Sequence, residues 1–134
     1  MDDKPLFPLY VCLDDGTVMQ IENENRILYH LEAVDIENDE YMFWDATGHD
    51  FRILIKKGKL VGFDKTHRNK LTLQQAFEQY AAQLREGGAA VDTMTGTPEE
   101  LWAKIEKAKQ SLPRRRSFFS RIFGRKPESV TVIA

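Results

Sequence analysis

The chain has 134 residues, of which 42% are hydrophobic and 30% are charged. This length suits one ordinary domain that needs neither disulfides nor metal for stability, and the composition excludes a wholly disordered or a membrane-spanning chain. The net charge of −2 conceals a strong division, since residues 1–50 hold 13 acidic and two basic residues while the remainder holds eight acidic and 17 basic ones.

Two further features concern where the protein resides. No apolar run approaches the roughly 20 residues that cross a bilayer, and the first residues are acidic, unlike the basic start of a signal peptide. We therefore expect a cytoplasmic protein. Its single cysteine, Cys12, excludes an intrachain disulfide, and its apolar surroundings predict a buried thiol.

The first half predicts strands separated by turns. Residues 9–13 and 17–21 flank Asp14-Asp15-Gly16, a hairpin signal because glycine accepts the positive φ of a tight turn. Residues 26–36 alternate between apolar and polar side chains as a half-buried strand does, and a slip in this pattern at Val34 predicts a β-bulge or bend. Three more strands are expected over residues 40–45, 50–56 and 59–64.

The second half changes to a helical period. One helix is expected to begin with Thr72 and Gln75 in capping-box positions and to stop at Gly87-Gly88. A second begins at Thr97-Pro98 and ends before Pro113. Short connections between the strands require antiparallel neighbours.

Together these elements predict an α+β fold. We expect an antiparallel β-meander of about six strands, curled into a small, partly open barrel-like sheet, followed by two α-helices and a basic amphipathic C-terminal segment. In terms of domains, residues 1–112 form a single α+β domain, with the meander in 1–66 and the two helices in 71–112. Residues 113–134 form a basic aromatic tail.

Candidate catalytic and metal-binding residues do not assemble into a recognisable pattern. His30, His49 and His67 lie in separate elements at spacings unlike those of zinc sites. Residues 45–50 resemble a calcium loop faintly but lack its later bidentate glutamate, and residues 88–96 lack the lysine of a phosphate-binding loop. We therefore expect no enzyme activity, no cofactor and no metal.

An acidic cluster lies between two predicted strands. It could bind a cation or a basic partner, or it could be an ordinary solvated turn. Its members are Asp35, Glu37, Asp39 and Glu40.

Residues 114–126 combine six basic residues with four large apolar ones and contain no acid. On a helix, at about 100° per residue, the apolar side chains between residues 117 and 124 fall within about 140°, which makes this part amphipathic. Aromatic rings with outward-reaching arginines are typical of helices that lie on anionic membranes. The candidate membrane- or partner-binding residues are Arg114, Arg115, Arg116, Phe118, Phe119, Arg121, Ile122, Phe123, Arg125 and Lys126.

Residues 117–124, with the sequence SFFSRIFG, resemble the short C-terminal membrane-targeting helix of the bacterial Min division-site ATPases. The resemblance covers about eight of the 134 residues and implies a shared physical device for membrane attachment rather than kinship. An alternative is that these phenylalanines dock on the protein's own sheet, with the arginines facing the acidic first half.

Three functions follow as hypotheses. The first is an adaptor that binds a protein partner and is attached to the cytoplasmic face of a membrane, or to that partner, through residues 114–126. The second is an immunity-type protein whose acidic half covers the cleft of a basic toxin or nuclease. The third and weakest is nucleic-acid binding through the arginines, which the acidic first half would oppose.

Overall fold

The computed structural model describes residues 4–112, and the predicted C-terminal segment lies outside these residues. The described part has an α+β fold, as expected. Its elements in chain order are β1 (Leu9–Cys12), β2 (Val18–Ile21), the 3-10 helix η1 (Glu24–Arg26), α1 (Ile27–His30), α2 (Ala33–Glu37), β3 (Met42–Trp44), β4 (Asp50–Lys56), β5 (Lys59–Asp64), α3 (Leu73–Glu86) and α4 (Pro98–Gln110).

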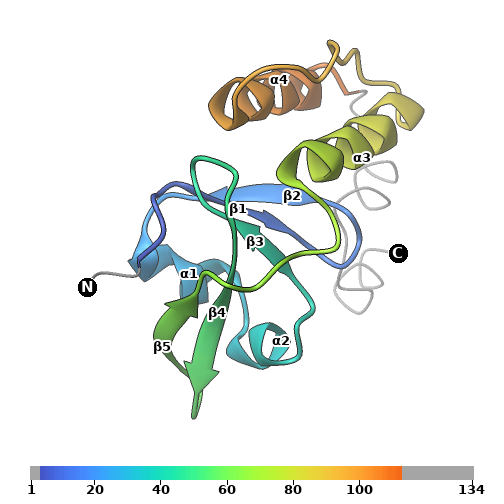
Figure 1. Ribbon diagram of the computed structural model, residues 1–134. Helices are drawn as coiled ribbons and strands as arrows, with labels where there is room; N and C mark the ends of the chain where they lie inside the picture. The colour runs from blue at the N-terminus through green and yellow to red at the C-terminus, as the bar shows by residue number, and fades with distance from the viewer. Residues whose placement is uncertain (1–3, 113–134) are drawn as a thin grey trace, which may run out of the picture.

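The strands form one antiparallel sheet in the order β2-β1-β3-β4-β5 (Figure 1). The predicted hairpins β1–β2 and β4–β5 are confirmed, with Leu9 opposite Ile21 and Lys56 opposite Lys59. The prediction of six strands is wrong, because residues 4–112 contain five. The barrel-like closure is also wrong, because β2 and β5 lie at opposite ends of an open sheet.

The segment that was expected to be the third strand is helical instead. Residues 24–37 contain η1, α1 and α2, and this segment buries Ile27, Leu31 and Ile36 while leaving Tyr29 72% exposed. The pattern slip at Val34 therefore marks no bulge: the backbone is extended at Leu31, between the two short helices. The physical reason is topological. Since β3 pairs with β1 on the side away from β2, the chain must cross a sheet face to reach it, and helices cover that face.

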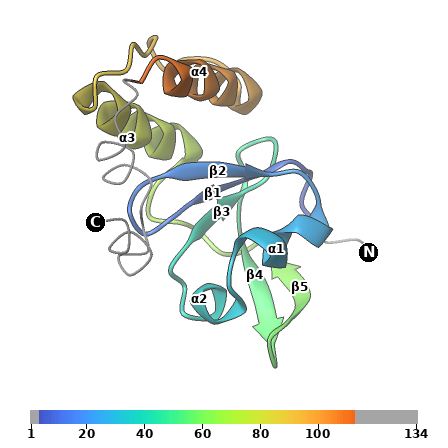
Figure 2. The ribbon, with the colours of Figure 1, turned by 180° about the vertical axis from the view of Figure 1, so that it is seen from behind.

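Two hydrophobic clusters cover the two faces of the sheet. Successive residues of β1 belong to the two clusters in turn: Leu9 and Val11 pack in one cluster, and Tyr10 and Cys12 pack in the other. Figures 1 and 2 show α3 and α4 on one side of the sheet and α1 and α2 on the other. All four residues of β1 are buried because this strand is covered on both faces.

Both predicted long helices are confirmed, together with their caps. Thr72 accepts a hydrogen bond from the backbone N–H of Gln75, whose side chain accepts one from the backbone N–H of Thr72. Thr97 and Glu100 form the same reciprocal pair at the start of α4. Each box satisfies two backbone donors that the helix itself leaves unpaired.

Candidate functional site

The predicted membrane- or partner-binding residues, from Arg114 to Lys126, all lie outside the described part of the chain. What the structure shows is where that segment is attached. Leu112, the last described residue, is 6% exposed and packs in the cluster between the sheet and the two long helices. The segment therefore follows an anchored residue.

The four predicted acidic residues lie close together along the chain, in α2 and the loop to β3, but they differ in their contacts. The carboxylate of Asp35 accepts a hydrogen bond from the hydroxyl of Tyr41 at 3.1 Å, and Asp39 forms a 3.2 Å ion pair with Arg52 of β4. Glu37 and Glu40 are exposed. Half of this acidic cluster is thus tied to its own domain, and Glu37 and Glu40 present their charge to solvent.

A surface groove of about 590 Å³ lies beside this acidic loop, and we call it the loop groove. Three segments and one helix side chain form it: the end of β1 with the turn after it, the loop before β3, and the loop between β5 and α3. Its residues are Cys12, Leu13, Asp14, Gly16, Asp39, Glu40, Tyr41, Met42, His67, Arg68, Asn69, Lys70, Leu71 and Gln79.

The charges around the loop groove are separated by segment. The turn after β1 and the loop before β3 contribute Asp14, Asp39 and Glu40, whereas the loop before α3 contributes Arg68 and Lys70. Opposite signs on different walls can orient a bound partner. Two of the four acidic residues singled out in the sequence, Asp39 and Glu40, line this groove, whereas Asp35 and Glu37 do not. Sequence reasoning missed Arg68 and Lys70, because residues 67–71 come next to the acidic loop only through the tertiary fold.

Hydrogen bonds fix the basic wall of the groove to the sheet. The backbone N–H of Asn69 donates to the carboxylate of Asp50 at 3.0 Å, and its side-chain amide donates to the carbonyl oxygen of Phe43 at 2.8 Å. Arg68 donates to the carbonyl oxygens of Lys65 and His67. These hydrogen bonds hold the loop in a fixed position against the sheet.

Cys12 is one of the residues that line the loop groove and is 2% exposed. Burial, with a smaller contribution from the charge of Asp15, raises the pKa of its thiol to about 11. The thiol is therefore protonated at neutral pH, and a protonated thiol is a weak nucleophile and a poor metal ligand. Cys12 instead packs as a small apolar side chain in the cluster between the sheet and the two long helices.

Asp45 is 4% exposed, in the turn between β3 and β4. Burial by itself would raise the pKa of this carboxyl group, but hydrogen bonds from the hydroxyl and backbone N–H of Thr47 and from the backbone N–H of His49 outweigh burial and lower the pKa below its ordinary value. All three donors belong to the same turn. Asp45 therefore stabilises a loop, as residues in such turns commonly do.

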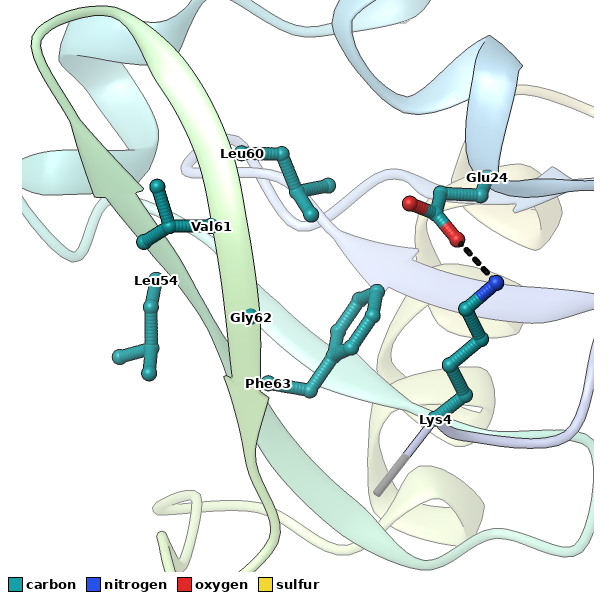
Figure 3. A pocket seen from close by; sticks show the side chains of 7 residues that line it. All are labelled: Lys4, Glu24, Leu54, Leu60, Val61, Gly62 and Phe63. Carbon is teal, nitrogen blue, oxygen red and sulfur yellow. Dashed lines mark ion pairs between the residues drawn. The ribbon is translucent and has the colours of Figure 1, made fainter. Parts of the chain in front are cut away.

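A second, smaller groove of about 330 Å³ lies beside β5, at the edge of the sheet (Figure 3). One wall is an ion pair between Lys4 and Glu24, with the charged atoms 2.9 Å apart. The other is largely apolar and includes Leu60, Phe63 and the 59% exposed Val61. We call it the edge groove. The sequence carried a signal for it, because three large apolar residues stand in β5, a strand that pairs on one side only within residues 4–112.

Between residues 4 and 112 there is no group of three or more histidine, cysteine or acidic side chains placed to hold a metal ion. None of the helices in this range is both long enough and apolar enough to span a membrane. Comparison of the chain with known protein families, with curated proteins and with solved structures gives no match.

Proposed function

We propose that this chain is a non-catalytic adaptor that binds a protein partner through the loop groove. In this proposal residues 114–126 attach the adaptor to an anionic membrane surface or to that partner. The observation that supports it best is the loop groove itself, which is lined by apolar side chains together with acidic and basic side chains from different segments.

The lining of the groove favours binding over chemistry. Leu13, Met42 and Leu71 are half-buried apolar residues of the lining and provide contact surface. Most of the other lining residues are polar or charged, a composition that suits recognition of a polar protein surface. The one potential nucleophile, the thiol of Cys12, has a raised pKa and is protonated at neutral pH. A partner segment with both acidic and basic side chains fits such a surface.

The distribution of charge supports attachment through the C-terminal segment. Residues 4–112 carry 18 acidic and 13 basic residues, a net charge of −5, whereas residues 113–134 carry six basic residues and one acidic residue, a net charge of +5. Each basic residue near an anionic membrane contributes roughly 1 kcal/mol of binding free energy. The domain itself would be repelled by such a surface, so attachment depends on the segment.

Affinity capture from a lysate of the source cells, with the full chain as bait, tests the partner. Lys70→Glu and Glu40→Lys each reverse the charge of one side chain that lines the loop groove. Lys57→Glu, in the turn between β4 and β5, is the matched control because Lys57 lies outside the groove. We expect a protein that wild type and the control retain and both groove variants lose. Equal capture by all four baits would show that the groove is not the binding surface.

Co-sedimentation with vesicles that contain phosphatidylglycerol tests the attachment. Full-length wild type is compared with a variant in which Phe118, Phe119 and Phe123 are all replaced by serine. We expect the variant to lose most of its vesicle binding, because the apolar contribution is removed while the charge is unchanged. Equal binding of the two proteins would exclude membrane attachment through these rings.

An immunity-type inhibitor is the second candidate, and the exposed carboxylates of Glu37 and Glu40 favour it. These two residues make a cleaner test than Asp35 or Asp39, which contact Tyr41 and Arg52 in their own domain. If the chain inhibits a cationic nuclease, Glu37→Lys with Glu40→Lys should weaken inhibition at low salt. Inhibition that is insensitive to these charges would exclude this candidate.

A further inference from the structure

The outer edge of β5 is the end of the sheet. Within residues 4–112, β5 pairs with β4 only, so one side of this strand carries backbone groups that no other strand of the described chain meets. Beside it, Val61 is 59% exposed and Leu54 is 38% exposed. An open edge with exposed apolar residues is a template for another strand.

The pairing of β5 with β4 shows which backbone groups face outward. A two-residue turn, Lys57-Gly58, joins the strands, with φ of 53° and 76°, and Lys56 lies opposite Lys59. In such a hairpin the flanking residues exchange hydrogen bonds, so the N–H and C=O of the next residue, Leu60, point away from β4. The same alternation along β4 leaves the backbone groups of Phe63 pointing outward.

The sequence of β5 is complementary to itself. It reads Lys-Leu-Val-Gly-Phe-Asp, with a positive charge at one end and a negative charge at the other. In an antiparallel pair of two such strands, centred between Val61 and Gly62, Lys59 lies opposite Asp64 of the second copy. Leu60 then lies opposite Phe63, and the branched Val61 lies opposite a residue that has no side chain.

The side chains lie on the faces that this pairing requires. Leu60 and Phe63 both pack against the cluster that α1 and α2 cover, and Figure 3 shows them pointing to the same side of β5, toward Lys4 and Glu24. In the pairing, Leu60 of one copy and Phe63 of the other would extend this apolar face across the two-fold axis. They would meet in the edge groove.

The charged residues of β5 lie on the other face, where Lys59 is opposite Lys56 and Asp64 is opposite Arg52. Asp64 accepts hydrogen bonds from the backbone N–H and the hydroxyl of Thr66, and both end on Oδ1. No hydrogen bond within the described residues ends on Oδ2. The carboxylate of Asp64 also lies near the positive charges of Arg52 and His67, and one of its oxygens stays outside the hydrogen bonds from Thr66.

A β-bulge makes this edge selective. Leu54 lies opposite Gly62 and Ile55 opposite Leu60, so Val61 is an extra residue on β5. A bulge and an edge lysine usually discourage pairing with an ordinary strand, whose spacing does not match. A second β5 that runs in the opposite direction has the same extra residue at the same place, so Leu60 and Phe63 stay opposite each other at both ends.

We propose that β5 pairs with β5 of a second copy of this chain, giving a two-fold dimer in which Lys59 of each copy contacts Asp64 of the other. The two-fold axis places the lysine-rich turns at opposite ends of the interface, so that they do not repel each other. This dimer uses neither the loop groove nor residues 114–126, and it is independent of the adaptor function.

A zero-length carbodiimide cross-link tests the contact on the native full-length chain. Protein labelled with ¹⁵N is mixed with unlabelled protein, treated with carbodiimide, digested and analysed by mass spectrometry. Within one copy Lys59 and Asp64 stand five residues apart on one strand, about 16 Å at 3.3 Å per residue, which a zero-length reagent cannot bridge. We expect a Lys59–Asp64 link that joins labelled to unlabelled peptide. Dimers linked only elsewhere, for example through Lys126, would overturn the proposal.

Charge exchange provides the second test, with sedimentation velocity over a concentration series. Lys59→Asp and Asp64→Lys each create two like-charge contacts in the dimer, and we expect each to weaken dimerisation roughly tenfold. The double variant restores both pairs with reversed signs and should dimerise like wild type. Lys56→Asp, on the same face but on β4, is the matched control and should have little effect.

Two outcomes would contradict this expectation. One is a single monomeric species for wild type up to millimolar concentration, where even a small interface is populated. The other is a double variant that dimerises no better than the single ones. Thermal melting of each variant shows whether it is folded, and the cross-link on wild type decides the question if Asp64→Lys does not fold.

Discussion

The carboxylate of Asp50 accepts a hydrogen bond from the backbone N–H of Asn69 at 3.0 Å, across 19 residues of sequence. The side chain of Asn69 also donates to the carbonyl oxygen of Phe43. One residue thus joins the loop before α3 to β3 and β4. This junction sets the position of the basic wall of the loop groove.

Asn69→Ala is expected to loosen that wall. The substitution removes the 2.8 Å hydrogen bond to Phe43, which should lower the free energy of unfolding by about 1 kcal/mol. Amide hydrogen exchange should become faster in residues 67–71. Asn25→Ala, at an exposed position in η1, is the control and should change neither quantity. Unchanged exchange in the loop of Asn69→Ala would show that Asn69 does not position it.

The turn held by Asp45 predicts a dependence of stability on pH. Because the pKa of Asp45 is lower in the folded protein than in the unfolded chain, the unfolded state binds more protons near pH 4. The contribution of Asp45 is therefore present above the unfolded pKa of about 3.9, and it is lost as the pH falls through the folded pKa.

Asp45→Asn should accordingly be less stable than wild type at pH 7, and urea denaturation from pH 7 to pH 3 should show this difference shrinking at the acid end. A protonated aspartic acid and asparagine are both neutral, which is why the two proteins converge. Asp64 also has a lowered pKa, because Thr66 donates to its carboxylate, and it contributes equally to both proteins. A difference that stays constant over the pH range would contradict the assignment to Asp45.

Alanine substitutions at Gly16 and Gly58 can separate the cost of backbone strain from the cost of a steric clash with a neighbouring side chain. Both have positive φ, 89° and 76°, so alanine is strained at either position. A Cβ at Gly16 would also meet the side-chain amide of Gln83, whereas nothing lies within 4 Å of a Cβ at Gly58. We expect Gly58→Ala to cost about 1 kcal/mol of stability and Gly16→Ala to cost more.

Gln83→Ala identifies the source of that difference. In wild type the amide of Gln83 donates to the carbonyl oxygen of Asp15 at 2.9 Å, which holds the β1–β2 turn against α3. If the added Cβ displaces this amide, Gly16→Ala combined with Gln83→Ala should be less destabilising than the sum of the two single changes. Strict additivity by chemical denaturation would show that the contact is relieved without cost.

Tyr80 carries a hydroxyl group that is buried without a hydrogen-bond partner among residues 4–112. Burial, and to a smaller extent the charges of Asp15 and Glu106, raises the pKa of this hydroxyl. Because an unpaired buried polar group is unfavourable, Tyr80→Phe should leave stability unchanged or raise it by about 1 kcal/mol.

Tyr10→Phe is the comparison, since the hydroxyl of Tyr10 accepts a hydrogen bond from the side chain of Gln20 at 3.3 Å. Tyr10→Phe should lower stability slightly. In thermal melts, its melting temperature should therefore fall below that of wild type, whereas the melting temperature of Tyr80→Phe should stay the same or rise. A marked destabilisation by Tyr80→Phe would indicate a buried water molecule bound to that hydroxyl.

Local signals predicted much of the fold. The predicted bounds of β4 and β5, the capping box at Thr72 and the helix start at Thr97 agree with the structure. The prediction failed over residues 26–36, where Ile27 and Leu31 fit a strand as well as a helix. In the candidate site, the acidic residues Asp39 and Glu40 line a groove. Arg68 and Lys70 line the same groove, but nothing in the sequence around them indicates this.

The sequence by itself determined the hairpins, the two long helices and the separation of charge, because each of these depends on residues that lie close together along the chain. Only the tertiary structure decided that β3 pairs with β1, that α1 and α2 cover the resulting face, and that β5 ends the sheet. Those outcomes depend on burying both faces of one sheet at once. This requirement involves segments far apart in the sequence, so it cannot be recognised in any one of them. The edge groove and the loop groove follow from that arrangement.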